Sequence, residues 1–276
     1  MISLSKLQQY KAEGTKFSCL TCYDATMAKA MEVAQIDTIL IGDSLGMTIQ
    51  GHDSTLPVTV EDMVYHTRAV RRGNQHALII TDLPFMSYST ITDAISAARQ
   101  VMQAGAQMIK LEGGAWLADT VRILAQGGIP SCVHLGLTPQ SVNVFGGYKV
   151  QAKTRSAADQ LLADCEAVVA AGATMLLLEC VPVQAAQEVQ ARFGVPVIGI
   201  GAGKYCDGQV LVMQDMLGLN FGKPARFVRN FLKDQLKDQL HGQGGENPIV
   251  DAFKSFHESV RQGSYPAPEH TFQIDL

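Results

Sequence analysis

Charged and imidazole side chains stand at the ends of short apolar runs along this sequence, where they could act together on a ligand. These residues are Asp43, Asp82, Lys110, Glu112, His134 and Glu179. One such residue alone is more typical of a helix cap, a solvated loop position or a core histidine with its hydrogen bonds satisfied. Six together are harder to explain in that way, because buried charges must be paired or must bind something.

Three carboxylates among them, Asp43, Asp82 and Glu112, indicate a hard divalent cation. Carboxylate oxygens favour Mg2+, and no Cys–His cluster that would favour zinc stands near them. A bound Mg2+ would leave positions open for the carboxylate and ketone oxygens of a 2-oxo acid. As a Lewis acid it would acidify the neighbouring C–H bond.

Lys110 and Glu179 supply the other two groups that such chemistry needs. Lys110 stands two residues before Glu112 and suits a substrate carboxylate or a developing enolate. Glu179 follows the apolar residues Met175–Leu178, where burial is expected to raise its pKa toward that of a useful proton acceptor. The residues therefore predict enolate chemistry on a 2-oxo acid.

Apolar runs alternate along the chain with segments of helical spacing, and most runs are nearly continuous, as in parallel strands covered on both faces. The predicted strands are Ser18–Tyr23, Thr38–Asp43, Ala77–Asp82, Met108–Glu112, Ser131–Leu135, Thr174–Glu179, Val195–Ile200 and Val210–Met213. Eight strands alternating with helices predict a single (β/α)8 TIM barrel, with an open doubly wound sheet as the main alternative.

Helical spacing is found between these runs and again after the last one. The predicted helices are Ala25–Ala34, Val60–Arg72, Thr92–Ala104, Trp116–Gln126, Ala157–Ala171 and Val183–Phe193, with additional C-terminal helices at Ala225–Leu240 and Pro248–Gln262. Gly242–Gly245 is expected to be a polar hinge between the last two. No segment resembles an interdomain linker, so residues 1–276 are expected to form one catalytic domain.

A barrel would gather the six polar side chains, because inward positions at the C-terminal ends of its strands line the active site. Strand alternation places Asp43 on the face of Ile39 and Ile41, and Asp82 on the face of Ile80. If these faces point inward, the polar side chains converge. The sequence leaves that phase open, since both faces of the strands are apolar.

Composition narrows the function classes. The net charge of −4 and the absence of a basic tract argue against nucleic acid as a partner. No apolar run approaches membrane-spanning length and no signal-peptide core is present, which predicts a cytoplasmic protein. Cys19 and Cys22 form a lone C-x-x-C on opposite strand faces, so they are expected to be core thiols rather than a metal site.

Two glycine-rich stretches invite a ligand-binding interpretation. Gly199–Gly203 follows a strand but lacks the spacing of a dinucleotide-binding loop, so a tight loop or close packing under a ligand is expected. Phe145–Tyr148 lies in a long segment whose length fits either a lid over the site or a plain surface loop.

Several long motifs, in the same order, resemble those of ketopantoate hydroxymethyltransferases. They are Gly42–Met47, Gln50–Thr59, Asp82–Phe85, Lys110–Gly114, His134–Gln140, Glu179–Pro182, Gly199–Gly203, Cys206–Gln209, Tyr265–Pro266 and Glu269–His270. The resemblance covers essentially the whole chain, and Leu219–Arg229 is the segment least similar to the family pattern.

This resemblance implies a (β/α)8 barrel that transfers a hydroxymethyl group from 5,10-methylenetetrahydrofolate to 3-methyl-2-oxobutanoate. The product would be 2-dehydropantoate, on the route to pantothenate. The resemblance also implies a Mg2+ ion in each subunit and a large homo-oligomer, typically a decamer.

Site roles implied by the resemblance can be assigned position by position. The metal ligands would be Asp43, Asp82 and Glu112. The oxo acid would contact Asp43, Ser44, Asp82 and Lys110. His134 would lie in the substrate pocket with its role left open, and Glu179 would be the proton acceptor.

Three rival interpretations stay open from the sequence. A barrel of the phosphoenolpyruvate mutase and isocitrate lyase type would use similar enolate chemistry, but no catalytic cysteine in a Lys/Arg-rich loop is found here. A Schiff-base aldolase would use Lys110 as its nucleophile. A non-catalytic carboxylate-binding barrel would bind its ligand without proton exchange.

Overall fold

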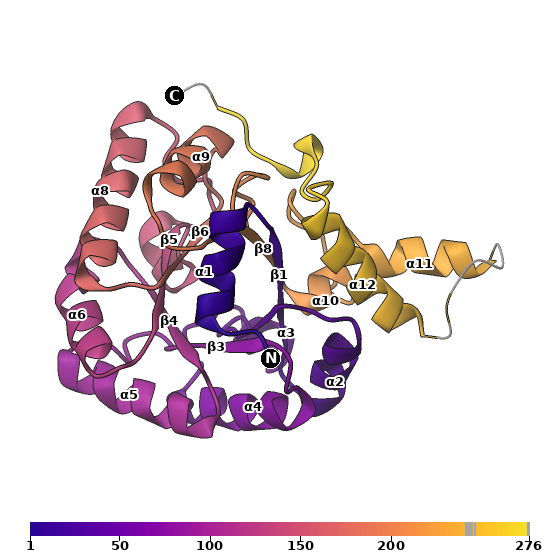
Figure 1. Cartoon of the computed structure of the whole chain (residues 1–276), viewed down its shortest axis with the longest axis horizontal. Helices are drawn as coiled ribbons and strands as arrows, with labels where there is room; N and C mark the ends of the chain where they lie inside the picture. Colours follow the sequence, from indigo (N-terminus) through magenta and orange to yellow (C-terminus); the bar gives the residue numbers. More distant parts are fainter. Residues whose placement is uncertain (241–244, 246, 275–276) are drawn as a thin grey trace.

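A closed parallel barrel forms the centre of the protein (Figure 1). The computed structural model describes residues 1–240, 245 and 247–274. The strands are β1 (Phe17–Thr21), β2 (Thr38–Ile41), β3 (Leu78–Asp82), β4 (Met108–Glu112), β5 (Ser131–Gly136), β6 (Met175–Glu179), β7 (Val197–Ile200) and β8 (Gly208–Leu211). Each strand pairs with its neighbours in chain order, and β8 closes the barrel on β1. The predicted (β/α)8 barrel is confirmed, and the open doubly wound sheet is wrong.

Side chains alternate between the barrel interior and the layer that faces the helices. Cys19, Leu40, Ile80, Met108 and Leu177 belong to one buried cluster inside the barrel. A second cluster, between barrel and helices, takes the alternate residues of the same strands together with apolar helix residues. Both strand faces are therefore apolar, because each is covered.

Helices surround the barrel, and several begin at side-chain caps placed by the sequence. The main ones are α2 (Ala25–Val33), α4 (Val60–Gly73), α5 (Ile91–Ala104), α6 (Ala118–Gln126), α8 (Arg155–Ala171) and α9 (Val183–Arg192). Thr59 and Asp62 form a reciprocal capping box at α4, and Thr90 caps α5, two residues before the predicted start. The predicted helices are present with ends shifted by one or two residues.

Short elements complete the strand-to-helix connections. They are α3 (Leu45–Thr48), η1 (Ala115–Leu117), η2 (Pro139–Ser141), α7 (Val142–Phe145), α10 (Met213–Met216) and η3 (Pro268–His270). The predicted helix Trp116–Gln126 is thus a 3-10 turn, η1, followed by α6.

An N-terminal helix that the sequence patterns did not predict, α1 (Leu4–Glu13), covers the end of the barrel where the strands begin (Figure 1). Leu7 is fully buried with Ile2 in the interior cluster, and Lys11 pairs with Asp207 just before β8. Only one buried side chain lies on this helix, so its apolar periodicity is too weak to reveal it.

Two departures from a regular barrel lie near the C-terminus. The chain runs from β7 to β8 through residues 201–207 without a helix between them. The predicted helix Ala225–Leu240 is wrong in its first turns, since α11 spans only Phe231–Leu240. Its partner α12 (Pro248–Arg261) packs on β1 and α2, and Phe231, Phe256 and Tyr265 make edge-to-face contacts.

The predicted hinge at Gly242–Gly245 falls mainly outside the described residues, of which only Gly245 belongs to it. No helix among residues 1–240 and 247–274 is long and apolar enough to cross a membrane.

Candidate active site

Polar residues converge at the C-terminal ends of β3 to β6. Asp82, Lys110, Glu112 and His134 follow the inward phase of their strands and are between 2% and 4% exposed. Glu179 ends β6 on the same phase and lies at the edge of this group, with 16% of its side chain exposed. The inward phase left open by the sequence is confirmed for these strands.

Asp43 also reaches this group, but not by the expected route. Ile39 and Ile41 face the helices and Leu40 faces the interior, so the face that Asp43 was expected to share points outward. Strand β2 ends at Ile41, and the turn at Gly42 then redirects the chain. The backbone N–H of Asp43 donates to Asp82 Oδ2 over 3.0 Å, which holds Asp43 beside the end of β3.

Lys110 provides a positive charge in the middle of the carboxylates. Its ammonium pairs with Asp82 Oδ1 and lies 3.6 Å from Glu112 Oε1. Burial by itself would lower the pKa of Lys110, but the surrounding carboxylates outweigh it and raise the pKa above its ordinary value. The ammonium is therefore a fixed charge at neutral pH.

His134 lies between two glutamates. Its Nδ1 makes a 3.1 Å hydrogen bond with Glu112 Oε1, and its Nε2 is 3.3 Å from Glu179 Oε2. Burial opposes protonation of the ring, yet the charge of Glu112 prevails and raises the pKa of His134 to about 9. Burial also acts against the ionised form of Glu112, but His134 and Lys110 leave its pKa below the ordinary value.

Negative charge is in excess at this end of the barrel. Burial, followed by repulsion from Asp82 and Glu112, raises the pKa of Asp43 well above its usual range. Burial and the charge of Glu112 likewise raise the pKa of Asp82, although Lys110 acts in the opposite direction. Lys110 and the protonated His134 give two positive charges to the four carboxyl groups of Asp43, Asp82, Glu112 and Glu179, so another cation would lower the electrostatic free energy of the group.

This donor set fits a divalent cation chemically, since three carboxylates are hard oxygen donors with surplus negative charge. In the part of the chain that the structure describes, no three acidic, histidine or cysteine side chains already point at one ion position. The oxygens of Asp82 and Glu112 are turned instead toward Lys110 and His134. A cation bound by these three carboxylates would therefore have to replace these contacts.

Gln140 joins the carboxylates, although sequence patterns mark it only as the end of the motif His134–Gln140. Its Nε2 donates to Asp43 Oδ2 over 2.8 Å, and its backbone N–H donates to Glu112 Oε2 over 2.9 Å. Tyr88 in turn donates its hydroxyl to Gln140 Oε1 over 2.5 Å. Sequence patterns could not reveal this contact, because Gln140 lies in a turn 97 residues from Asp43.

Ser44, expected to contact the substrate, is half-buried next to Asp43. Its hydroxyl hydrogen-bonds that of Tyr23 over 2.8 Å, which places it at the mouth of the charged group. Glu179 is positioned by backbone geometry at the end of β6. Gly136 has φ +87, and a Cβ there would lie 2.4 Å from the carbonyl oxygen of Glu179, so only glycine allows β5 and β6 to approach in this way.

A family model described as ketopantoate hydroxymethyltransferase matches residues 1–268. The chain belongs to the ketopantoate hydroxymethyltransferase family. This confirms the resemblance of the motifs. A relative from Acinetobacter baylyi, named 3-methyl-2-oxobutanoate hydroxymethyltransferase, is 71% identical over the full length of both chains. A relative of the same name from a Psychrobacter species is 63% identical over 99% of this chain and all of its own.

Solved structures of other enzymes share the barrel of this ketopantoate hydroxymethyltransferase family member. A phosphonopyruvate hydrolase solved with oxalate and Mg2+ has a TM-score of 0.61 at 11% identity, covering 97% of this chain and 100% of its own. A 2,3-dimethylmalate lyase of the PEP mutase/isocitrate lyase superfamily has a TM-score of 0.59 at 14% identity, covering 97% and 99%. At such low identity the likeness shows the fold alone.

The two glycine-rich stretches have different surroundings: one forms the β7–β8 connection, and the other contacts the segment after β2. Gly201 and Gly203 have positive φ in the short β7–β8 connection, and a Cβ at Gly203 would lie 2.7 Å from Val183. The tight-loop interpretation is thus supported and a nucleotide loop is not. In the other stretch, Tyr148 places its hydroxyl 3.4 Å from Met47 Sδ, so this segment extends over the β2 connection.

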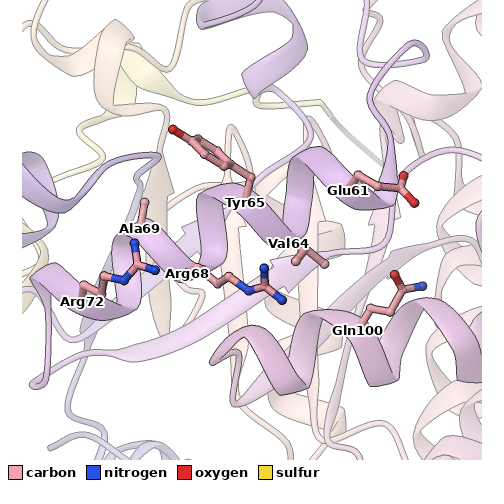
Figure 2. A pocket seen from close by; sticks show the side chains of 7 residues that line it. All are labelled: Glu61, Val64, Tyr65, Arg68, Ala69, Arg72 and Gln100. Atoms are coloured by element: carbon pink, nitrogen blue, oxygen red, sulfur yellow. The ribbon is translucent and has the colours of Figure 1, made fainter.

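Other features lie apart from the charged group. All six cysteines are free and buried, and Cys19 and Cys22 lie in different clusters on opposite sides of β1, as predicted. A surface hollow lined by one face of α4 and by Gln100 of α5 lies on the outer helix layer (Figure 2). Tyr65, Arg68 and Arg72 border this hollow, and none of them is at a strand end.

Proposed function

We propose that this protein transfers a hydroxymethyl group from 5,10-methylenetetrahydrofolate to 3-methyl-2-oxobutanoate, giving 2-dehydropantoate in the first step of pantothenate biosynthesis. The family and the shared name of relatives at 71% and 63% identity support this transferase activity. The single observation that carries the chemistry is the buried group of three carboxylates around Lys110, with more negative than positive charge.

Asp43, Asp82 and Glu112 would hold Mg2+ in this proposal, and their excess charge supports the assignment. When bound, the ion would act as a Lewis acid on the oxygens of the 2-oxo acid. Asp43 and Asp82 would lie beside the substrate as well, because an Mg2+ ion keeps part of its coordination shell for ligands other than protein.

Lys110 would orient the oxo acid and stabilise negative charge on it. Its ammonium is buried beside Asp82 and Glu112, so its charge already lies next to the carboxylates before the substrate binds. Ser44 would donate its hydroxyl to the substrate from the mouth of the site, where Tyr23 holds it.

Glu179 would accept the proton from C3 of 3-methyl-2-oxobutanoate. The C3–H bond breaks, the proton passes to a Glu179 carboxylate oxygen, and the electron pair moves into the enolate of the substrate. His134 Nε2 lies 3.3 Å from Glu179 Oε2, so the ring would orient the base rather than attack the substrate.

Carbon–carbon bond formation completes the transfer. Water would add to the one-carbon unit of 5,10-methylenetetrahydrofolate, both of its C–N bonds would break, and tetrahydrofolate would leave with the carbon at the oxidation level of formaldehyde. The enolate C3 would then attack this carbonyl carbon, and its oxygen would take a proton to become the hydroxyl of the product. We further propose that residues 1–276 act as one catalytic domain. The subunits are expected to assemble into a homo-oligomer, a decamer, and the enzyme is expected to work in the cytoplasm.

Proton exchange tests the first half of the reaction without the folate. The full chain is incubated with 3-methyl-2-oxobutanoate and Mg2+ in D2O, and the C3 proton is followed by NMR. Exchange that EDTA abolishes is expected. Exchange that persists in EDTA would remove the metal from the mechanism. No exchange, together with no product when folate is added, would favour a binding protein.

Schiff-base chemistry at Lys110 is the second candidate to test. The pairing of its ammonium with Asp82 opposes a role as a neutral amine nucleophile. Borohydride treatment in the presence of the oxo acid should therefore leave Lys110 unmodified in a peptide mass map. A reduced adduct at Lys110 would support the aldolase instead.

A further inference from the structure

Gln140 is buried between residues that belong to separate sequence motifs. It lies in η2, directly after β5, and is 6% exposed. We propose that Gln140 is a positioning residue whose side chain holds the Asp43 carboxylate, while its backbone holds Glu112, so that both face a shared cation. This inference rests on the proposed function and adds to it a residue that touches no reacting atom.

Four strand ends meet through this one residue. The Nε2 group donates to Asp43 Oδ2 after β2 over 2.8 Å and to the carbonyl oxygen of Leu83 after β3 over 3.0 Å. The backbone N–H donates to Glu112 Oε2 at the end of β4 over 2.9 Å. Because Gln140 follows β5, its contacts fix the spacing of all four ends.

Tyr88 determines which way the Gln140 amide points. The tyrosine hydroxyl accepts from the backbone N–H of Glu112 over 3.3 Å, and donates its own hydrogen to Gln140 Oε1 over 2.5 Å. A flipped amide would direct its oxygen at two acceptors, Asp43 Oδ2 and the Leu83 carbonyl. The NH2 group must therefore face Asp43.

Asp43 needs such a partner more than the other carboxylates do. It stands beyond the end of β2, where strand geometry no longer sets its direction. Lys110 pairs with Asp82 and lies close to Glu112, but no ion pair joins it to Asp43 among the described residues. Without Gln140, the Asp43 carboxylate would be free to turn away from two like charges.

Magnesium affinity of the metal-free full chain, measured by isothermal titration calorimetry, tests this role. Gln140→Ala and the volume-conserving Gln140→Met should each raise the Mg2+ dissociation constant by about 10- to 100-fold, as for other residues that orient metal ligands. The Mg2+ concentration giving half-maximal C3 proton exchange should rise in parallel, while exchange at saturating Mg2+ falls less.

Tyr88→Phe should have a smaller effect in the same direction, because it removes the donor that fixes the amide together with the hydroxyl's contact to the backbone of Glu112. Added to Gln140→Ala, it should weaken binding by less than it does in the parent protein, since much of its effect passes through the Gln140 amide. This double-variant cycle separates positioning from general loosening, whose effects would add.

Gln190→Ala is the matched control. Gln190 also donates its Nε2 to a buried aspartate, Asp207 Oδ1, over 2.8 Å, but at the opposite end of the barrel. The Mg2+ affinity of the Gln190→Ala variant should equal that of the parent protein. Unchanged affinity in both Gln140 variants, equal weakening by Gln190→Ala, or fully additive Tyr88→Phe effects would each overturn the inference. If the parent protein neither binds Mg2+ nor exchanges the proton, the proposed function itself fails.

Discussion

Buried carboxylates occur at two kinds of place in this barrel, and their partners differ. Asp37 pairs with Arg261 of α12 and accepts the backbone N–H of Ser18 over 2.9 Å. Asp207 pairs with Lys11 of α1 over 2.8 Å and accepts the backbone N–H of Val197 over 2.8 Å. Each of these aspartates has a cation of its own and attaches a terminal helix to the barrel.

The strand ends around Lys110 are arranged differently. Asp43, Asp82 and Glu112 share this lysine and the protonated His134, and repulsion among the carboxylates, added to burial, raises the pKa of Asp43 and Asp82. Carboxylates that each have a cation hold the structure together. Carboxylates in excess over the cations repel one another, and a bound cation can remove this repulsion. Charge balance therefore distinguishes the acids that attach the terminal helices from those proposed to bind the ligand, although both kinds are buried.

Among the residues around Lys110, Glu179→Gln should have the largest effect on the reaction. Removing the proton acceptor is expected to slow C3 proton exchange by about 10²- to 10⁴-fold. Because Glu179 is the most exposed of these acids, the melting temperature should change little. NMR exchange rates and calorimetric melting curves measure the two effects. An exchange rate near that of the parent protein would exclude Glu179 as the base.

Asp37→Asn should show the opposite pattern. It leaves the Arg261 guanidinium without its carboxylate and should lower the free energy of unfolding by about 3 kcal/mol. Urea titration of the metal-free protein measures this loss. The Mg2+ affinity of the Asp37→Asn variant should stay at the parent value. A large fall in affinity would contradict the division between acids that attach helices and acids proposed to bind the cation.

Magnesium itself should stabilise the parent protein. At an Mg2+ concentration 100 times the dissociation constant, the stabilisation is expected to be about 2.7 kcal/mol. Asp82→Asn should remove most of this increase, and Asp37→Asn should keep it. Melting curves with and without Mg2+ give both values. A parent protein whose stability is insensitive to Mg2+ would count against the cation site.

Rising pH should weaken the metal-free protein between about pH 5, just above the pKa of an unfolded aspartate, and pH 9, near the pKa of His134, by the smallest effect in this series. Burial and repulsion raise the pKa of Asp43 and Asp82 in the folded state, so their ionisation at higher pH opposes folding. The Glu112 charge raises the pKa of His134 despite burial, and the stability from its protonated form is also lost as pH rises toward 9. Glu112, with a lowered pKa, is already ionised throughout this window.

Asp43→Asn tests the origin of this dependence. The substitution removes one of the repelling charges, so urea midpoints of the metal-free variant should fall less from pH 5 to pH 9 than those of the parent. The same slope in both proteins would show that the surplus charge does not cause it.

Strand alternation predicted which strand neighbours share a face with Asp82, Lys110, Glu112, His134 and Glu179, because these residues belong to regular strands. It left open which face points inward, and the structure shows that this one does. The same reasoning assigned Asp43 to the wrong face. Period-two alternation holds only while the backbone is extended, and β2 stops at Ile41. The helices α1 and α11 show the same limit, since weak periodicity hid one and misplaced the start of the other.

By itself, the sequence determined the barrel, its family and the residue types available for chemistry. These depend on local spacing and on the order of motifs, which the chain carries directly. Only the tertiary structure decided how charge is shared: which acid meets Lys110, which meets Arg261, and which depends on Gln140. Those contacts join residues far apart in the chain, because closing a barrel brings strand ends together irrespective of their separation in sequence.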